Sequence, residues 1–382
     1  MISYPSSKLP DFGASIFSVM SGLANEYKAI NLSQGFPDFN CPESLMQLVT
    51  KYMHAGFNQY APMAGMPQLR EKISLKTERM YGYRPNPDTE VTVTTGATEA
   101  LNAAITAMVK PGDEVVILEP SYDSYVPVIR LCGGSPIYVP LALPDFHVDW
   151  GLVKRRLSSR TRLIIINTPH NPTGAVMTKE DMDRLANLID GTDIMVVSDE
   201  VYEHMVFDDK QHYSALQQPL LRERSFVISS FGKTYHTTGW KVGYAVAPPP
   251  LTNELRKMHQ YITFCTATPF QLALADFMEE EAHYLNLPNF YQAKRDLFYD
   301  LLRNSRFEAS PSSGTYFQLV KYDKVSDAYD LDFARHLTKE VGVAAIPVSA
   351  FYHDKTDHKY LRFCFAKSED TLRAAGEKLA VL

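Results

Sequence analysis

Lys233 has the surroundings in this sequence that most clearly indicate chemistry. It lies in SSFGKTYHTTGWKVGY (229–244), directly after a strand-like run and between glycines. A lysine amine that is removed from water becomes less basic and can act as a nucleophile and a proton carrier. A lysine considered alone is by default a solvated surface residue. The flanking strand and glycines favour the functional interpretation.

The glycines around Lys233 do not form a nucleotide-binding loop. Gly232-Lys233-Thr234 matches the end of a P-loop, but that motif needs another glycine five positions before the GK pair, where this chain has Val227. The turn at 95–98 contains a single glycine and lacks the spacing of a dinucleotide fingerprint. Both observations argue against a nucleotide hydrolase and a nicotinamide enzyme.

Asp199 and Tyr202 follow a second buried run. Asp199 comes directly after the residues MVVS, and Tyr202 lies three positions further on in DEVY (199–202). A helix or turn cap is the alternative role for Asp199, and core packing is the alternative for Tyr202. A carboxylate at the end of a buried strand is a candidate for binding a positively charged group.

Composition and charge exclude several classes of protein. The chain has 382 residues, 45% hydrophobic and 21% charged, with a net charge of −6. These values predict a folded, soluble protein that has neither nucleic acid nor membrane as its main partner. The four cysteines and the histidines have no metal-ligand spacing, so we expect no metal site. The N-terminal residues do not read as an export signal, which predicts a cytoplasmic protein.

The pattern of elements predicts an α/β fold. Strands with helices between most of them are expected at 91–94, 114–118, 163–167, 194–198, 226–229 and 243–246, which is typical of a mostly parallel sheet flanked by helices. Long helical patterns follow at 251–281 and 282–303. A smaller α+β unit would contain strands at 314–320 and 360–365 and helices at 331–341 and 368–381. We expect an N-terminal arm with part of the small domain (1–44), a large domain (45–285) and a small C-terminal domain (286–382).

Eight ordered motifs resemble one known family. They are SQGFPDF (33–39), QYAPMAGMPQLR (59–70), TTGATEAL (94–101), PSYDSYVP (120–127), NTPHNPTG (167–174), DEVY (199–202), the lysine segment (229–244) and LRFCFA (361–366). Together they are similar to the class I/II aminotransferases, which have fold type I. This resemblance implies pyridoxal 5′-phosphate as the cofactor, bound in the large domain through Lys233.

The resemblance also implies roles for the residues that surround the cofactor. Asp199 would pair with the pyridine nitrogen, Tyr202 and Asn171 would donate to the phenolic oxygen of the ring, and Tyr122 would stack on the ring. Ala97 and Thr98 at a helix start, with Ser230 and Lys241, would bind the phosphate. Many relatives carry arginine at the position of Lys241, and lysine lacks the bidentate fork of arginine.

The resemblance assigns the substrate side to other segments. Arg362 would bind the α-carboxylate through two parallel hydrogen bonds, and Gly35 would let the backbone approach that group. Phe36, Tyr122 and Tyr316 are candidates for the side-chain pocket, with core packing as the alternative. Tyr60 would reach the phosphate of a neighbouring subunit's cofactor, which implies a homodimer with shared active sites.

The implied activity is transamination between an amino acid and a 2-oxo acid. The subfamily resemblance is to methionine, glutamine and kynurenine aminotransferases. HQYITFCTATPF (259–270) has no arginine to bind a second carboxylate, so we expect a neutral apolar or aromatic donor, methionine first, rather than aspartate. The alternatives are a kynurenine aminotransferase, a β-lyase that cleaves cysteine S-conjugates, and a non-catalytic regulator that binds pyridoxal phosphate.

Overall fold

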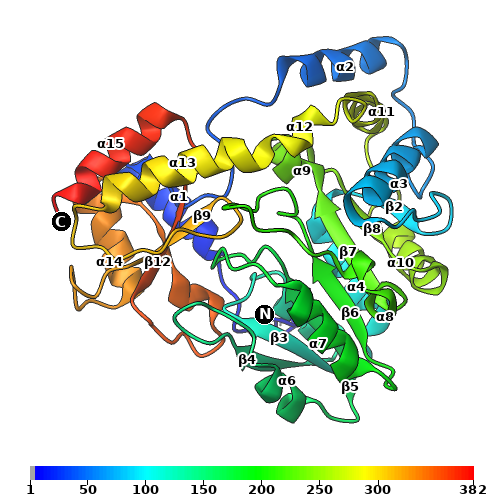
Figure 1. Cartoon of the computed structure of the whole chain (residues 1–382), viewed down its shortest axis with the longest axis horizontal. Coiled ribbons are helices and arrows are strands. Elements are labelled where there is room, and N and C mark those ends of the chain that lie inside the picture. Colours follow the sequence, from blue (N-terminus) through cyan, green and yellow to red (C-terminus); the bar gives the residue numbers. More distant parts are fainter. Residues whose placement is uncertain (1–4) are drawn as a thin grey trace.

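The computed structural model describes residues 5–382, and a seven-stranded sheet forms its centre (Figure 1). The strand order is β2-β8-β7-β6-β5-β3-β4, and only β8 runs antiparallel to its neighbours. The strands are β2 (Val91–Thr94), β3 (Glu114–Glu119), β4 (Ser135–Pro140), β5 (Thr161–Asn167), β6 (Met195–Asp199), β7 (Ser225–Ser230) and β8 (Gly243–Val246). This confirms the mostly parallel sheet. β4 was not predicted because SPIYVP contains two prolines, which only an edge strand tolerates.

Helices cover both faces of this sheet. On one face Val115, Ile165 and Ile228 pack with α4 (Gly96–Met108) and α10 (Pro249–Ile262), and on the other face the alternate strand residues join a larger core. Since both faces are buried, the strands are continuous apolar runs rather than alternating ones. The other helices along this part of the chain are α2 (Glu43–His54), α3 (Pro67–Tyr81), α5 (Tyr125–Leu131), α6 (Trp150–Arg156), α7 (Lys179–Ile189), α8 (Pro219–Arg222) and α9 (Phe231–Thr234).

The C-terminal part of the chain forms two smaller sheets. β11 (Ile346–Pro347), β12 (Tyr360–Cys364) and β9 (Phe317–Lys321) make an antiparallel sheet in that order. β1 (Ile30–Asn31) pairs with β10 (Val343–Ala344), so the N-terminal segment packs with this part. The helices here are α1 (Ile16–Glu26), α13 (Leu287–Leu302), α14 (Asp330–His336), which continues as a π-helical turn (Leu337–Val341), and α15 (Glu369–Ala380). The proposed domain boundaries are compatible with this grouping and stay a prediction.

The long helical patterns predicted at 251–281 and 282–303 are wrong in their extent. The first is divided into α10 and α11 (Thr268–Phe277), and the second into α12 (Ala282–Leu285) and α13. Phe264 has a positive φ of 68°, which a helix does not allow, and prolines occupy the first turns of α11 and α13. No helix within residues 5–382 has the length and apolar character to span a membrane.

Three neighbouring parallel strands end at the same edge of the large sheet. β5 ends at Asn167, β6 at Asp199 and β7 at Ser230, and α9 with Lys233 follows β7 directly. The N-terminus of α4 follows β2 at the turn around Gly96. Ligands of open α/β sheets bind outside the carboxyl ends of the strands. The fold therefore brings the polar residues of four separate motifs to one place.

Candidate active site

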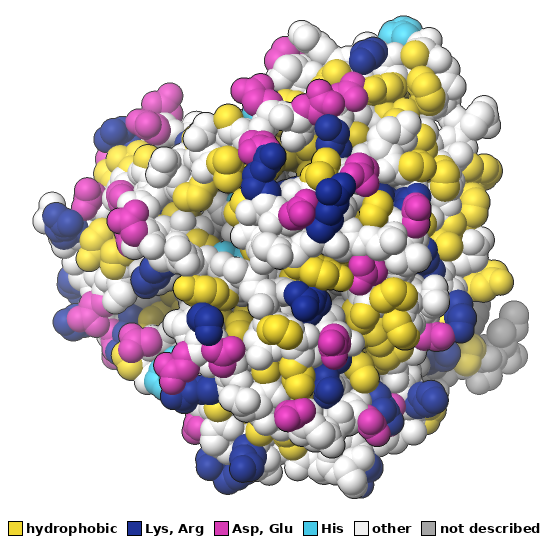
Figure 2. Space-filling view, turned by 45° about the vertical axis from the view of Figure 1, so that its right-hand side comes forward, with side chains coloured by type: hydrophobic (Ala, Val, Ile, Leu, Met, Phe, Trp, Pro, Cys, Tyr) yellow, Lys and Arg dark blue, Asp and Glu magenta, His cyan; other side chains and the backbone are white. Residues whose placement is uncertain are grey.

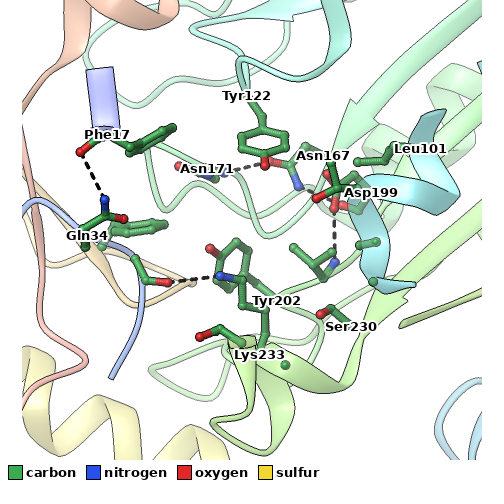
Figure 3. A pocket seen from close by; sticks show the side chains of 18 of the residues that line it. Phe17, Gln34, Leu101, Tyr122, Asn167, Asn171, Asp199, Tyr202, Ser230 and Lys233 are labelled. Carbon is green, nitrogen blue, oxygen red and sulfur yellow. Dashed lines mark hydrogen bonds between the residues drawn. The ribbon is translucent and has the colours of Figure 1, made fainter. Parts of the chain in front are cut away.

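A cavity of about 250 Å³ lies at the carboxyl edge of the sheet. Figure 3 shows Tyr122 and Asn171 on one side of it, Lys233 and Ser230 on the opposite side, Asp199 at one end, and Phe17 and Gln34 at the other. The lining residues include these predicted ones: Gly35, Ala97, Thr98, Tyr122, Asn171, Asp199, Tyr202, Ser230, Lys233, Lys241 and Arg362. Residues separated by more than 300 positions in the sequence thus share one cavity.

Asp199 is buried and holds one hydrogen bond on each carboxylate oxygen. The Tyr125 hydroxyl donates to Oδ2 at 2.7 Å, and the Val201 amide donates to Oδ1 at 3.3 Å. Burial raises the pKa of Asp199 to about 6, while both hydrogen bonds act to lower it. A carboxylate in such a place is stabilised by a positively charged partner, which is the condition for binding a protonated ring nitrogen.

The opposite end of the cofactor region has the features of an anion site. The first amides of α4 at Ala97 and Thr98 point outward from the helix N-terminus, where the helix dipole is positive. Lys241 Nζ lies 3.4 Å from Thr98 Oγ1. A Cβ at Gly243 would come 2.7 Å from the Ala97 amide nitrogen, so β8 can pass the helix start at this distance only as glycine. These groups fit a phosphate.

Lys233 lies between these two ends. Its Nζ donates to the Tyr316 hydroxyl at 2.7 Å and to the Gly35 carbonyl at 3.1 Å. Removal from bulk water lowers the pKa of Lys233 to about 8, and the charges of Arg362 and Lys241 act in the same direction. A pKa of about 8 leaves about a tenth of the amine neutral at pH 7 and more as the pH rises, and the neutral form is the nucleophile.

Arg362 is 1% exposed and is held in position by two other segments. Its NH1 donates to Asn171 Oδ1 at 2.8 Å and its NH2 donates to the Ser33 carbonyl at 3.0 Å. The Nε atom has no hydrogen-bond partner among residues 5–382. A buried guanidinium nitrogen without a partner is costly unless a ligand completes it. Arg362 thus has the geometry of an anion-binding residue.

Aromatic rings surround Arg362. The guanidinium carbon lies 3.8 Å from the ring centre of Phe317 and 5.1 Å from that of Phe17. Sequence reasoning missed Phe17 and Phe317, together with Gln34 and Asn167. Phe17 carries no local signal because α1 joins the site only through the tertiary fold. Asn167 ends a strand as Asp199 does, so its position gave a usable signal: its side-chain amide donates to the Asp199 carbonyl and its oxygen accepts from the Asn171 amide.

Two of the predicted residues lie elsewhere than expected. Phe36 does not line the cavity; it is 44% exposed, its ring lies beside Lys367, and its carbonyl accepts a hydrogen bond from the same lysine. Tyr316 lies behind Lys233 rather than along the cavity wall. Tyr60 is 84% exposed and does not line the cavity of its own chain, so its role across a subunit interface stays a prediction.

A lysine with a lowered pKa between an anion site and a buried carboxylate, together with a separate arginine that faces apolar rings, defines a pyridoxal-phosphate-type site on a fold-type-I scaffold. Within residues 5–382 no group of three His, Cys, Asp or Glu side chains is suited to a metal ion. The model of the family described as aminotransferase class I and II matches residues 27–379. The chain belongs to this family and is a pyridoxal-phosphate-dependent transaminase.

Individual relatives cover the whole chain. The chain is 55% identical to the methionine aminotransferase of Escherichia coli over 379 residues, which is 99% of this chain and 98% of that protein. A crystal structure from Escherichia coli, described as identifying a methionine aminotransferase function, superposes with a TM-score of 0.98 at 54% identity and covers all of both chains. A probable N-succinyldiaminopimelate aminotransferase of Mycobacterium tuberculosis is 38% identical over 98% of each chain.

Proposed function

We propose that this enzyme transfers the amino group of a neutral apolar or aromatic L-amino acid, methionine first, to a 2-oxo acid. The observation that carries this proposal is the substrate end of the cavity, where one arginine faces aromatic rings. Among the described residues, the cationic side chains that line the cavity are Lys233, Lys241 and Arg362. Lys233 binds the cofactor, Lys241 lies at the phosphate end and Arg362 binds the α-carboxylate. No further cationic side chain among the described lining residues remains to bind a carboxylate on the substrate side chain. The named activity of the 55% identical relative supports the same donor.

Each residue has a distinct task in the proposed reaction. When bound, pyridoxal phosphate supplies an electron sink for the pair left on the substrate α-carbon. Asp199 balances the charge of the ring nitrogen, Tyr202 and Asn171 donate to the phenolic oxygen, and Tyr122 covers the ring. Ala97, Thr98, Ser230 and Lys241 bind the phosphate.

Lys233 and Arg362 act on the substrate. Arg362 binds the α-carboxylate with the N–H groups that have no partner among the described residues, Nε included. This contact aligns the α-hydrogen of the substrate with Lys233. Lys233 Nζ then carries the proton between the substrate α-carbon and C4′ of the cofactor, because its lowered pKa leaves the amine partly neutral. Gly35 provides the close backbone approach beside the carboxylate.

A panel of donors tests the substrate proposal. We expect kcat/KM for aspartate to fall below that for methionine by roughly ten- to a hundredfold, because a missing charged hydrogen bond costs about 1.5–3 kcal/mol. Phenylalanine, histidine and kynurenine complete the panel, against one fixed oxo-acid acceptor. Aspartate equal to or better than methionine contradicts the proposal. Release of pyruvate, ammonia and thiol from cysteine S-conjugates indicates the β-lyase instead, and no turnover indicates the regulator.

The proposal includes a homodimer with shared active sites. Tyr60 lies against Phe264, and Tyr261 close by is 89% exposed and Ile262 44% exposed. Figure 2 shows hydrophobic side chains in groups on the side of the molecule where α3 and α10 come forward. In the proposed dimer Tyr60 reaches the phosphate bound by the partner subunit.

We also propose a cytoplasmic location, since the scattered cysteines fit a reducing compartment.

Subunit mixing tests the shared site. Lys233→Ala and Tyr60→Phe subunits, each of low activity, are expected to recover activity when they are unfolded and refolded together, because a mixed dimer contains one site with both residues intact. The same treatment of each variant alone is the control. A fully active protein that sediments as a monomer contradicts the proposal.

A further inference from the structure

The hydrogen bonds around Lys233 Nζ form a closed set with Tyr316 and Gly35. Lys233 Nζ lies 2.7 Å from the Tyr316 hydroxyl oxygen and 3.1 Å from the Gly35 carbonyl oxygen. The Tyr316 hydroxyl also donates a short hydrogen bond to the same Gly35 carbonyl. Three groups from α9, from the loop that follows β1, and from the residue before β9 therefore meet at one point.

The number of donors and acceptors fixes the direction of these bonds. A carbonyl oxygen accepts only, and the single hydrogen of Tyr316 is used for the Gly35 carbonyl. Tyr316 can therefore only accept from Lys233. A neutral amine has two N–H bonds and one lone pair, so both N–H bonds are used and the lone pair has no hydrogen bond to these partners. That is the state a general base and a nucleophile require.

Packing holds the Tyr316 ring in place. The residue is fully buried, and its ring contacts those of Tyr202, Tyr291 and Phe317 at centroid distances of 5.1, 5.8 and 4.9 Å. The Gly35 loop is equally restricted, because a Cβ there would come 2.8 Å from the Phe317 ring. The acceptor and the carbonyl thus keep a fixed geometry around the amine.

We propose that Tyr316 is a positioning residue for Lys233, which orients the released amine so that its lone pair faces the cavity. This inference rests on the proposed function of Lys233. In the step concerned the substrate Cα–H bond breaks, its electron pair stays on the substrate–cofactor system, and the proton forms a third N–H bond on Nζ. The resulting ammonium returns that proton to C4′. Tyr316 gains and loses no proton; it keeps the amine aligned for both transfers.

The Tyr316→Phe variant tests this role, because it removes the acceptor and keeps the ring. We expect kcat for methionine to fall about 10- to 100-fold, a part of what a positioned acid–base group contributes, with KM changed less than about twofold. The kinetic isotope effect with α-deuterated methionine should increase, since proton transfer becomes slower than the other steps. The cofactor-free protein should also capture pyridoxal phosphate more slowly, measured by the visible absorbance of the lysine-bound cofactor.

Tyr291→Phe is the matched control. Its hydroxyl is also buried and hydrogen-bonded, to His236 Nδ1 at 3.0 Å, and its ring touches Tyr316 without reaching Lys233. We expect it to keep the isotope effect and the capture rate. A Tyr316→Gln variant restores an acceptor and should recover part of the lost kcat; if Tyr316→Phe does not fold, Tyr316→Gln is compared with Tyr291→Phe instead.

Several results overturn the proposal. They are an unchanged isotope effect and capture rate in Tyr316→Phe, or changes that Tyr291→Phe shows equally. Failure of the proposed function itself has a different signature, because borohydride would then fix pyridoxal phosphate to a residue other than Lys233 in the wild-type protein.

Discussion

Two lysines lie inside this protein in opposite electrostatic situations. Lys76 on α3 is buried with its Nζ 2.6 Å from Glu203 and 2.8 Å from the Tyr244 hydroxyl. The positive charge of Lys76 holds the pKa of Glu203 below its usual range. Lys233 instead donates to a hydroxyl and a carbonyl, and among residues 5–382 no carboxylate forms a salt bridge with it.

The difference separates a structural lysine from a reactive one. Burial lowers the pKa of Lys76 as well, but the charge and the contact of Glu203 act to raise it, so the ion pair favours the ammonium form of Lys76 and occupies its amine. Within the described chain, Lys233 has no contacting carboxylate to oppose the effect of burial, which lowers its pKa to about 8. The two sites are also connected, because Glu203 lies four residues after Asp199 and anchors the segment that carries Asp199 and Tyr202.

The largest effect is expected for Lys233→Ala. Activity should fall by roughly 10⁴-fold or more, because the variant loses both the cofactor's covalent attachment and the proton carrier. Turnover measurements and the visible absorbance of the bound cofactor check this. The free energy of unfolding of the cofactor-free protein should change little, since no ion pair is lost. Substantial turnover in the Lys233→Ala variant would contradict the assignment of Lys233 as the reactive lysine.

Lys76→Met should act on stability instead. Breaking a buried ion pair leaves Glu203 unpaired and costs about 3–5 kcal/mol. Denaturant unfolding of the cofactor-free protein measures this loss. The double variant Lys76→Met with Glu203→Leu is the control and should recover a large part of it, because no buried charge remains. A loss near zero in the single variant would show that the pair contributes nothing to the fold.

Asp199→Asn should keep the fold and lower kcat by about 10²–10³-fold, the usual cost of removing one electrostatic partner of a reacting group. An amide cannot balance the charge of the ring nitrogen. Steady-state kinetics with saturating methionine give the value. Near-normal rates would mean that another acid performs this task.

Tyr125→Phe is expected to have the smallest effect of the four. It removes the 2.7 Å hydrogen bond to Asp199 and leaves the carboxylate in place. We expect the pKa of Asp199 to rise above about 6, because this hydrogen bond lowers it. On the acid side of the pH profile, kcat should then be about tenfold lower than in the unchanged enzyme. The pH profile of kcat measures the shift. Tyr322→Phe is the control and should leave the profile unchanged, because it removes a hydroxyl that donates to Asp357 in the segment before β12.

The cofactor end of the site was predictable because its residues end buried strands. Asp199 and Ser230 each terminate an apolar run, and the carboxyl ends of parallel strands meet at one edge. The fold class and nearly all central strands could be predicted for the same reason, since period and composition are local properties. β4 was not predicted because its two prolines are untypical of a strand inside a sheet, although an edge strand tolerates them.

The substrate end was less predictable because tertiary contacts assemble it. Phe17 arrives on α1, Arg362 on β12 and Tyr316 from the turn before β9, and no spacing in the sequence connects them. Phe36 lies exposed beside Lys367, a contact between distant segments that the sequence does not reveal. The helix break at Phe264 shows as one positive backbone angle, which the apolar pattern does not reveal.

The central claim is that the amine without a counter-ion is the one that binds the cofactor. Cofactor-free protein is incubated with pyridoxal phosphate across a pH series and reduced with borohydride, and the modified peptide is identified by mass spectrometry. The account predicts one adduct, on Lys233, whose initial rate of formation rises as the pH passes through about 8, because the neutral amine is the nucleophile. An adduct on Lys76 or another lysine, or a rate that rises only near the ordinary lysine value of 10.5, would contradict it.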